Sequence, residues 1–150
     1  KSFMDSTGDG IGDLRGIITK LDYLKDLGID AIWISPIYKS PNCDNGYDIS
    51  DYRDISPDFG TLDDFYELLK QVHMRDMKLM IDLVINHTSD LHPWFIESKS
   101  SKYNSKRNFY IWKQGSKENE PNNWRGIFGG SVWEYDINTK EYYFLKISRT

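Results

Sequence analysis

The run from Asp82 to His87 places polar side chains inside and directly after an apolar segment. Asp82 is a lone carboxylate, and burying an unpaired carboxylate costs several kcal/mol, so it needs partners. Asn86 and His87 follow at the carboxyl end of the run, the end that faces the active site in enzymes with parallel strands. The run therefore predicts a polar site that could hold a substrate. The alternative is a satisfied core histidine and an aspartate that anchors a turn.

A polar loop lies between Cys43 and Asp48. An exposed tyrosine such as Tyr47 can stack on the CH face of a sugar ring, while neighbouring acids such as Asp44 accept hydrogen bonds from sugar hydroxyls. The loop is therefore a candidate sugar-binding site. The competing interpretation is a plain Asn45–Gly46 turn.

A third segment places oxygen-bearing groups at alternate positions with glycines between them, a pattern typical of calcium loops. The expected ligands are the side chains of Asp5, Thr7, Asp9 and Asp13 and the carbonyl of Ile11. Gly16 stands where an EF-hand needs a bidentate glutamate, so this is not an EF-hand. Several carboxylates and a carbonyl suit calcium better than magnesium. The alternative is an Asp/Gly turn that caps the next helix.

Apolar spacing indicates the elements that position these segments. Leucines and isoleucines recur at three and four residues between Asp13, a candidate N-cap, and Gly28, a candidate end, which predicts one helix. A second helix is predicted over residues 61–76, because Thr61 and Asp64 resemble a capping box.

Two nearly continuous apolar runs, residues 31–38 and 78–85, predict strands covered on both faces of a parallel sheet. The order helix, strand, helix, strand is typical of an α/β fold with parallel crossovers. From His87 onward the periodicity is lost, and four of the five tryptophans fall in this stretch. Because long structureless loops are uncommon in compact domains, we expect an inserted, aromatic-rich subdomain there. Its tryptophans suit either a carbohydrate platform or a core.

Composition excludes several classes of protein. The 150 residues are 39 % hydrophobic and 15 % aromatic, enough for a sizeable core, and the net charge of −4 leaves no basic stripe for nucleic acid. No apolar run reaches the roughly 18 to 20 residues that cross a bilayer, so no membrane partner is expected. Cys43 is the single cysteine, which excludes an internal disulfide and fits a reducing, cytoplasmic location.

Taken together, these stretches resemble the α-amylase superfamily, in the order and spacing of its oligo-1,6-glucosidase and α-glucosidase branch. The resemblance covers residues 2 to about 143 and includes the superfamily's first signature region, IDLVINH. The other matching stretches are DSTGDGIGDLRGI, LDYLKDLGIDAIWISPIYKSPNCDNGYDISDY, FGTLDDF and EPNNWRGIFGGSVWEYD.

The resemblance implies an α/β fold that is the N-terminal part of a (β/α)8 TIM barrel. Residues 1–87 would supply strands two and three of the barrel with their helices. Residues 88–150 would form an incomplete, loop-rich subdomain inserted after strand three.

The resemblance also implies roles for single residues. Asp44 and His87 would hold hydroxyls of the glucose unit, Tyr47 would stack beneath it, and Asp82 would brace the floor of the pocket. Phe128 would line the same pocket. The loop from Asp5 to Asp13 would bind a structural Ca²⁺, although position 7 is commonly asparagine in this branch.

The implied chemistry is retaining hydrolysis of short α-glucosides, which requires two carboxyl groups roughly 5 Å apart. In the family these are an aspartate after the fourth strand and a glutamate after the fifth, and neither is present in this chain. We therefore expect no glucosidase activity from the 150 residues alone.

Several alternatives share the resemblance. Trehalose-6-phosphate hydrolysis and sucrose isomerisation are nearby reactions, and one non-catalytic relative is the ancillary subunit of an amino-acid transporter. The retained Asp44, Tyr47 and His87 favour an enzyme over the ancillary subunit. A pure calcium-binding module is a further possibility.

Overall fold

The structure is a computed structural model that describes residues 1–127 and 129–145. The chain divides into two compact units, Lys1–Ser89 and Asp90–Thr150. The sequence prediction placed the boundary after His87. Among the described residues, no helix is both long enough and apolar enough to cross a membrane.

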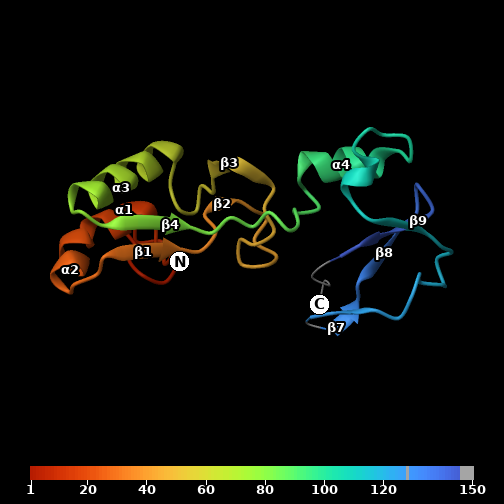
Figure 1. The fold of residues 1–150 in the computed structure, drawn as a ribbon, viewed down its shortest axis with the longest axis horizontal. Coiled ribbons are helices and arrows are strands. Elements are labelled where there is room, and N and C mark those ends of the chain that lie inside the picture. The colour runs from red at the N-terminus through yellow and green to blue at the C-terminus, as the bar shows by residue number, and fades with distance from the viewer. Residues whose placement is uncertain (128, 146–150) are drawn as a thin grey trace. The chain divides into compact units, whose positions relative to one another are not determined.

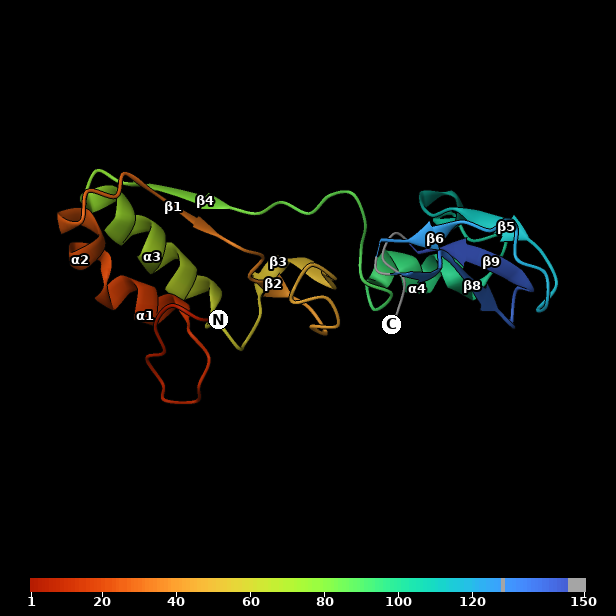
Figure 2. The same ribbon diagram turned by 90° about the horizontal axis from the view of Figure 1, so that it is seen from below.

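The first unit packs its helices on one face of a short parallel sheet (Figures 1 and 2). Its elements are α1 (Leu14–Thr19), α2 (Leu21–Asp26), β1 (Ala31–Ile34), β2 (Tyr38–Lys39), β3 (Asp51–Ile55), α3 (Leu62–Met74) and β4 (Lys78–Ile81). Leu14, Leu21, Leu68 and Val72 are fully buried between the helices and the sheet. Thr61 and Asp64 form the predicted capping box at the start of α3, which is confirmed.

The first predicted helix is interrupted at Lys20, which separates α1 from α2. In a continuous helix, the Lys20 N–H would donate to the carbonyl of Gly16. The Thr19 hydroxyl donates to that carbonyl instead, at 2.7 Å, and the Lys20 N–H donates to Ile17 at 3.0 Å. The prediction of one helix was therefore wrong, because a threonine side chain competes for a main-chain acceptor.

β1 and β4 pair in parallel from Ala31 opposite Lys78 to Ile34 opposite Ile81, which confirms the predicted parallel sheet. Both strands are shorter than the predicted 31–38 and 78–85. Pro36 has no N–H for the ladder, and the chain turns there into the antiparallel pair β2–β3 (Figure 2). The prediction of two covered faces was also wrong for these residues, since Trp33 is 56 % exposed and Met80 is 51 % exposed.

The second unit has more regular structure than the loop-rich subdomain that the sequence predicts. Its elements are α4 (Pro93–Ser100), the 3-10 helix η1 (Arg107–Phe109), β5 (Trp112–Gln114), β6 (Arg125–Gly126), β7 (Gly129–Ser131), β8 (Trp133–Asp136) and β9 (Glu141–Phe144). β5, β9 and β8 form an antiparallel sheet in that order. Phe95 of α4 packs edge-on against Tyr143 of β9, with ring centroids 5.0 Å apart.

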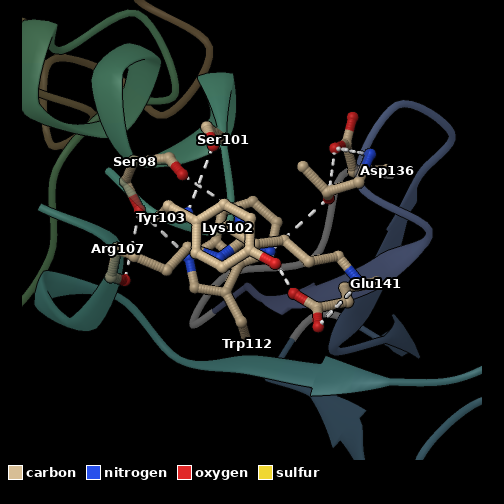
Figure 3. Close-up of polar contacts among 9 residues, drawn as sticks. Ser98, Ser101, Lys102, Tyr103, Arg107, Trp112, Asp136 and Glu141 are labelled. Carbon is tan, nitrogen blue, oxygen red and sulfur yellow. Dashed lines mark hydrogen bonds and ion pairs between the residues drawn. The ribbon is translucent and has the colours of Figure 1, made fainter. Parts of the chain in front are cut away.

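A buried arginine, Arg107 of η1, connects four elements of the second unit, η1, α4, β5 and β9 (Figure 3). The Arg107 guanidinium lies 3.3 Å from the ring centroid of Trp112 and donates to the Ser98 carbonyl at 2.9 Å. It also pairs with the carboxylate of Glu141, which Lys102 approaches to 3.1 Å. We call these five residues the Arg107 cluster.

Candidate functional site

The loop between β2 and β3 turns sharply at Asn45 and Gly46. Their φ values of 51° and 95° and a 2.9 Å hydrogen bond from the Tyr47 N–H to the Asp44 carbonyl describe a type I′ turn. A positive φ at both central residues favours the observed Asn-Gly pair. The Asn45–Gly46 turn, which was the alternative interpretation of this loop, is therefore present. It places Asp44 and Tyr47 at its two ends.

Asp48 holds this loop from within. Its carboxylate accepts hydrogen bonds from the Ser40 hydroxyl at 2.7 Å, the Cys43 N–H at 2.9 Å and the Asp44 N–H at 3.1 Å. The Cys43 side chain is exposed beside these contacts. The loop is thus ordered by one carboxylate rather than by a strand ladder.

Asp82 has the partners that a carboxylate in an apolar run requires. Its carboxylate acts electrostatically on two phenols, those of Tyr47 and of the buried Tyr38. The pKa of Tyr47 is raised mainly by burial and next by its hydrogen-bonding interaction with Asp82. The charge of the nearby Asp44 carboxylate raises it further. Burial, together with the charge of Asp82, also raises the pKa of Tyr38. Both phenols therefore stay protonated and able to donate at neutral pH.

His87 lies against the same tyrosine. Its Nε2 atom is 3.0 Å from the Tyr47 carbonyl oxygen, and because a carbonyl only accepts, Nε2 carries the hydrogen. Its Nδ1 atom is 2.5 Å from the Oδ1 atom of Asn86. An amide oxygen only accepts, so in a neutral ring, where Nδ1 also accepts, the Asn86 amide is turned over and its NH₂ donates to Nδ1. A sugar hydroxyl would therefore replace one of these two contacts.

The structure thus connects Asp82 to His87 through Tyr47 and places Asp44 close by. Phe128, the fifth predicted residue, lies outside the described residues. Sequence reasoning missed three further residues that hold this arrangement, namely Tyr38, Asp48 and Tyr52. A tyrosine in a strand signals that its hydroxyl needs a partner, but not which partner it finds.

The predicted metal loop curls around Asp5. The carboxylate of Asp5 accepts from the N–H groups of Gly8 at 2.7 Å and Gly10 at 2.8 Å, and these bonds, with that of Gly10 the largest cause, lower its pKa to about 2. Asp13 caps α1 by accepting from Gly16 at 2.6 Å, so the alternative of a capping turn is also present. A Cβ on Gly16 would collide with the Met4 carbonyl, which lies over the helix start.

The donors of this loop are all oxygens, as calcium prefers. Asp5 Oδ1 already accepts three hydrogen bonds and each Asp13 oxygen accepts two, so some of these bonds would have to give way to an ion. Within the described part of the chain, however, no three His, Cys, Asp or Glu side chains gather into a metal-binding group. The donor types therefore fit calcium, while the acids would have to move closer together to share one ion.

The second unit contains an open cavity of about 770 Å³ whose lining includes Glu120, Trp133 and Tyr142. Trp133 and Tyr142 are 5 % and 3 % exposed, and their polar atoms donate to Asn122 and to main-chain carbonyls. Their ring faces are therefore not available for stacking on a sugar. These two aromatic residues belong to a core rather than to a carbohydrate platform.

A family model described as "Alpha amylase, catalytic domain" matches residues 1–150. The chain is 64 % identical over 149 residues to the oligo-1,6-glucosidase of Bacillus cereus and 62 % identical over 149 residues to that of Parageobacillus thermoglucosidasius. These matches cover 99 % of this chain but only 27 % and 26 % of those proteins. The chain thus spans about a quarter of the length of the relatives it matches.

Solved structures also match the chain over almost its whole length. The isomaltulose synthase PalI from Klebsiella sp. LX3 is 57 % identical and superimposes with a TM-score of 0.95, covering 99 % of this chain and 27 % of PalI. A MutB mutant in complex with glucose is 55 % identical with a TM-score of 0.95, covering the same shares.

Proposed function

The chain belongs to the α-amylase catalytic-domain family, and from this premise we propose that the protein carrying it hydrolyses short α-glucosides as an oligo-1,6-glucosidase or α-glucosidase. The observation that carries the proposal is the 3.0 Å contact between the His87 imidazole and the Tyr47 carbonyl, next to a Tyr47 phenol on which the Asp82 carboxylate acts. These residues come from segments 35 or more positions apart, and they meet beyond the carboxyl ends of β1 and β4. Substrate sites of parallel α/β enzymes lie at that end of the sheet.

In this proposal, β1 and β4 are the second and third strands of a (β/α)8 barrel. Their parallel pairing supports this, since α3 lies between them in the chain, as in a βα unit. The pocket would take a neutral glucose unit: Asp44 and His87 accept from and donate to its hydroxyls, and the half-buried Tyr47 offers its ring. Asp82 holds the Tyr47 hydroxyl, and Phe128 lines the same pocket.

The reaction is retaining hydrolysis. A carboxylate attacks the anomeric carbon while a carboxylic acid protonates the leaving oxygen, and water then releases the glucose. Those two groups belong to the remainder of the longer protein. The role of this chain is to bind and orient the glucose unit, through hydrogen bonds that strengthen as the ring approaches the transition state.

A hybrid enzyme tests this proposal. In the Bacillus cereus oligo-1,6-glucosidase, this chain replaces the matching 149 residues, a change that 64 % identity makes tolerable; we call the product the hybrid glucosidase. We expect it to release glucose from isomaltose and p-nitrophenol from its α-glucoside. Asp44→Asn should lower kcat/KM about a hundredfold, because the sugar hydroxyl loses a charged partner.

Asp30→Asn is the matched control, since Asp30 is exposed beside β1 and away from the loop. It should leave kcat/KM unchanged. A hybrid glucosidase that folds but hydrolyses neither substrate would refute the proposed function, and so would an Asp44→Asn variant as active as its parent.

Sucrose isomerisation is the second candidate, because isomaltulose synthases share the fold at 55–57 % identity. Incubation of the full-length protein with isomaltose and, separately, with sucrose distinguishes the two activities. Glucose release from isomaltose without isomaltulose formation supports the glucosidase, whereas isomaltulose as the main product supports the isomerase.

The loop from Asp5 to Asp13 is the proposed structural calcium site. Asp5, Asp9, Asp13, Thr7 and the Ile11 carbonyl would hold the ion, which would tie the loop to the start of α1. Calorimetric titration of the chain with calcium chloride tests the site. We expect heat of binding and a raised melting temperature for the parent and the Asp30→Asn control, and neither for Asp9→Asn. Equal binding by Asp9→Asn would refute this ligand set.

A further inference from the structure

The segment that carries His87 has neither helix nor strand to fix it. Residues 82–89 follow β4 in irregular backbone, and the Ile85 side chain within them is 78 % exposed. Ordering a residue's backbone costs about 1–2 kcal/mol. A binding residue in this segment therefore depends on side chains elsewhere that hold its main chain.

Tyr52 of β3 supplies such a contact. Its hydroxyl oxygen lies 2.7 Å from the carbonyl oxygen of Val84 and 2.6 Å from that of His87. The hydroxyl has one hydrogen, which the two carbonyls share. One side chain therefore holds two main-chain positions, at the start and at the end of residues 84–87.

The Tyr52 ring is itself fixed by packing. It lies 5.8 Å from the Tyr38 ring, at an interplanar angle of 46°. It also packs against a small cluster whose buried members are Tyr38, Ile49 and Val84. The hydroxyl is therefore presented to the two carbonyls by a ring with little freedom to move.

The contact reaches the sugar site through the main chain. Fixing the His87 carbonyl fixes the direction in which its imidazole leaves the backbone, and that imidazole reaches the Tyr47 carbonyl. A further hydrogen bond, from the Ser89 N–H to the Ile49 carbonyl at 2.9 Å, attaches the end of the segment to the loop between β2 and β3.

We propose that Tyr52 is a positioning residue of the sugar pocket. It acts through its hydroxyl, which holds the main chain of residues 84–87 so that His87 faces Tyr47. The inference rests on the proposed function in one respect, namely that the ligand of His87 is a sugar. The contacts themselves are independent of that function.

Tyr52→Phe in the hybrid glucosidase removes only the hydroxyl oxygen and keeps the packed ring. We expect kcat/KM for p-nitrophenyl α-glucoside to fall about tenfold, the effect of about one lost hydrogen bond. Tyr66→Phe is the matched control, because Tyr66 is 57 % exposed on α3 and its hydroxyl is remote from the site. It should leave kcat/KM unchanged.

A double-mutant cycle separates positioning from general stabilisation. If Tyr52 acts through His87, Tyr52→Phe should change kcat/KM less than twofold once His87→Ala is also present. A full tenfold loss in that background, or no loss in the parent background, would overturn the proposal.

Hydrogen–deuterium exchange gives a readout that needs no activity. In Tyr52→Phe, peptides covering residues 84–89 should exchange at least about tenfold faster, while those from β1 and β4 keep the parental rate. Unchanged exchange in residues 84–89 refutes the inference even if the hybrid is active. An inactive hybrid with the expected exchange refutes the proposed function alone.

Discussion

Asp48 contacts no sugar in the proposed pocket, yet three donors of the loop that presents Asp44 converge on its carboxylate. A glucose unit can be held only if Asp44 and Tyr47 keep their spacing. In the proposed pocket, the affinity for glucose should therefore depend on residues that order the loop as well as on those that would bind the sugar.

Asp48→Ala removes all three acceptor contacts at once. We expect the free energy of unfolding of the hybrid glucosidase to fall by about 1–3 kcal/mol, because two main-chain N–H groups lose their partner. We also expect the KM for isomaltose to rise several-fold. Urea unfolding and initial rates measure the two effects, with Asp30→Asn as the control. An unchanged KM would show that the loop keeps its shape without this carboxylate.

Asp5 gives the chain an acid-resistant carboxylate. Its pKa is about 2 in the folded chain against 3.8 for an ordinary aspartate, so its contribution to stability is present above pH 3.8 and is lost as the pH falls toward 2. At about pH 3 we expect Asp5 to be about nine-tenths ionised when folded and about one-seventh ionised in urea. Carbon-detected NMR of the carboxyl group measures both. Equal ionisation in the two states would contradict the loop geometry.

Sequence spacing identified Asp44, Tyr47, Asp82 and His87 as candidates, and the structure brings them close together. Sequence spacing could not identify Tyr52. The contacts of the Tyr52 hydroxyl depend on how the irregular backbone after β4 folds back toward β3. Alternation and helical periodicity carry no information on such segments.

Among the elements of the second unit, the Arg107 cluster holds η1, β5 and β9 together with the end of α4 (Figure 3). Arg107 is 7 % exposed, so its loss leaves the Glu141 carboxylate without its buried partner. Arg107→Met should therefore lower the free energy of unfolding of this unit by about 3 kcal/mol.

Urea unfolding followed by exchange in peptides of β5 and β9 measures this loss. Arg107→Lys should not restore stability, because an ammonium cannot stack flat on Trp112. Arg53→Met, at a side chain that is 93 % exposed, is the control and should have little effect. Full stability of Arg107→Lys would show that only the charge matters.

The elements show where sequence reasoning stops. The capping box of α3 is local and was predicted correctly, since all its groups lie within four residues. The break between α1 and α2 was missed, because it depends on the rotamer of Thr19 rather than on apolar spacing. The strands described in the second unit have two to four residues each, which is too short to give a periodic signal.

At the scale of the whole molecule, the exposed face of β1 and β4 indicates that the sheet needs further neighbours. Trp33 of β1 and Met80 of β4 are both more than half exposed. The parallel pair and the polar residues beyond it follow from the sequence. The prediction of burial on both faces does not hold for Trp33 and Met80, because the side chains that would cover a second face cannot be identified from the apolar content of the strand alone.

The 150-residue polypeptide by itself should have no glucosidase activity. It holds the glucose-binding residues of the proposed pocket, but not the two carboxyl groups that the retaining reaction requires. Incubation of the purified polypeptide with p-nitrophenyl α-glucoside should release p-nitrophenol no faster than buffer does. Measurable release, abolished by Asp44→Asn, would overturn this expectation.

Cys43 is the only thiol in the chain, and it is exposed one residue before Asp44. A maleimide-linked fluorophore would therefore attach at a single position without any engineering of the sequence. Because the neighbouring backbone is held by Asp48, the dye would lie beside the proposed pocket, and a change in its emission on adding glucose would report binding there.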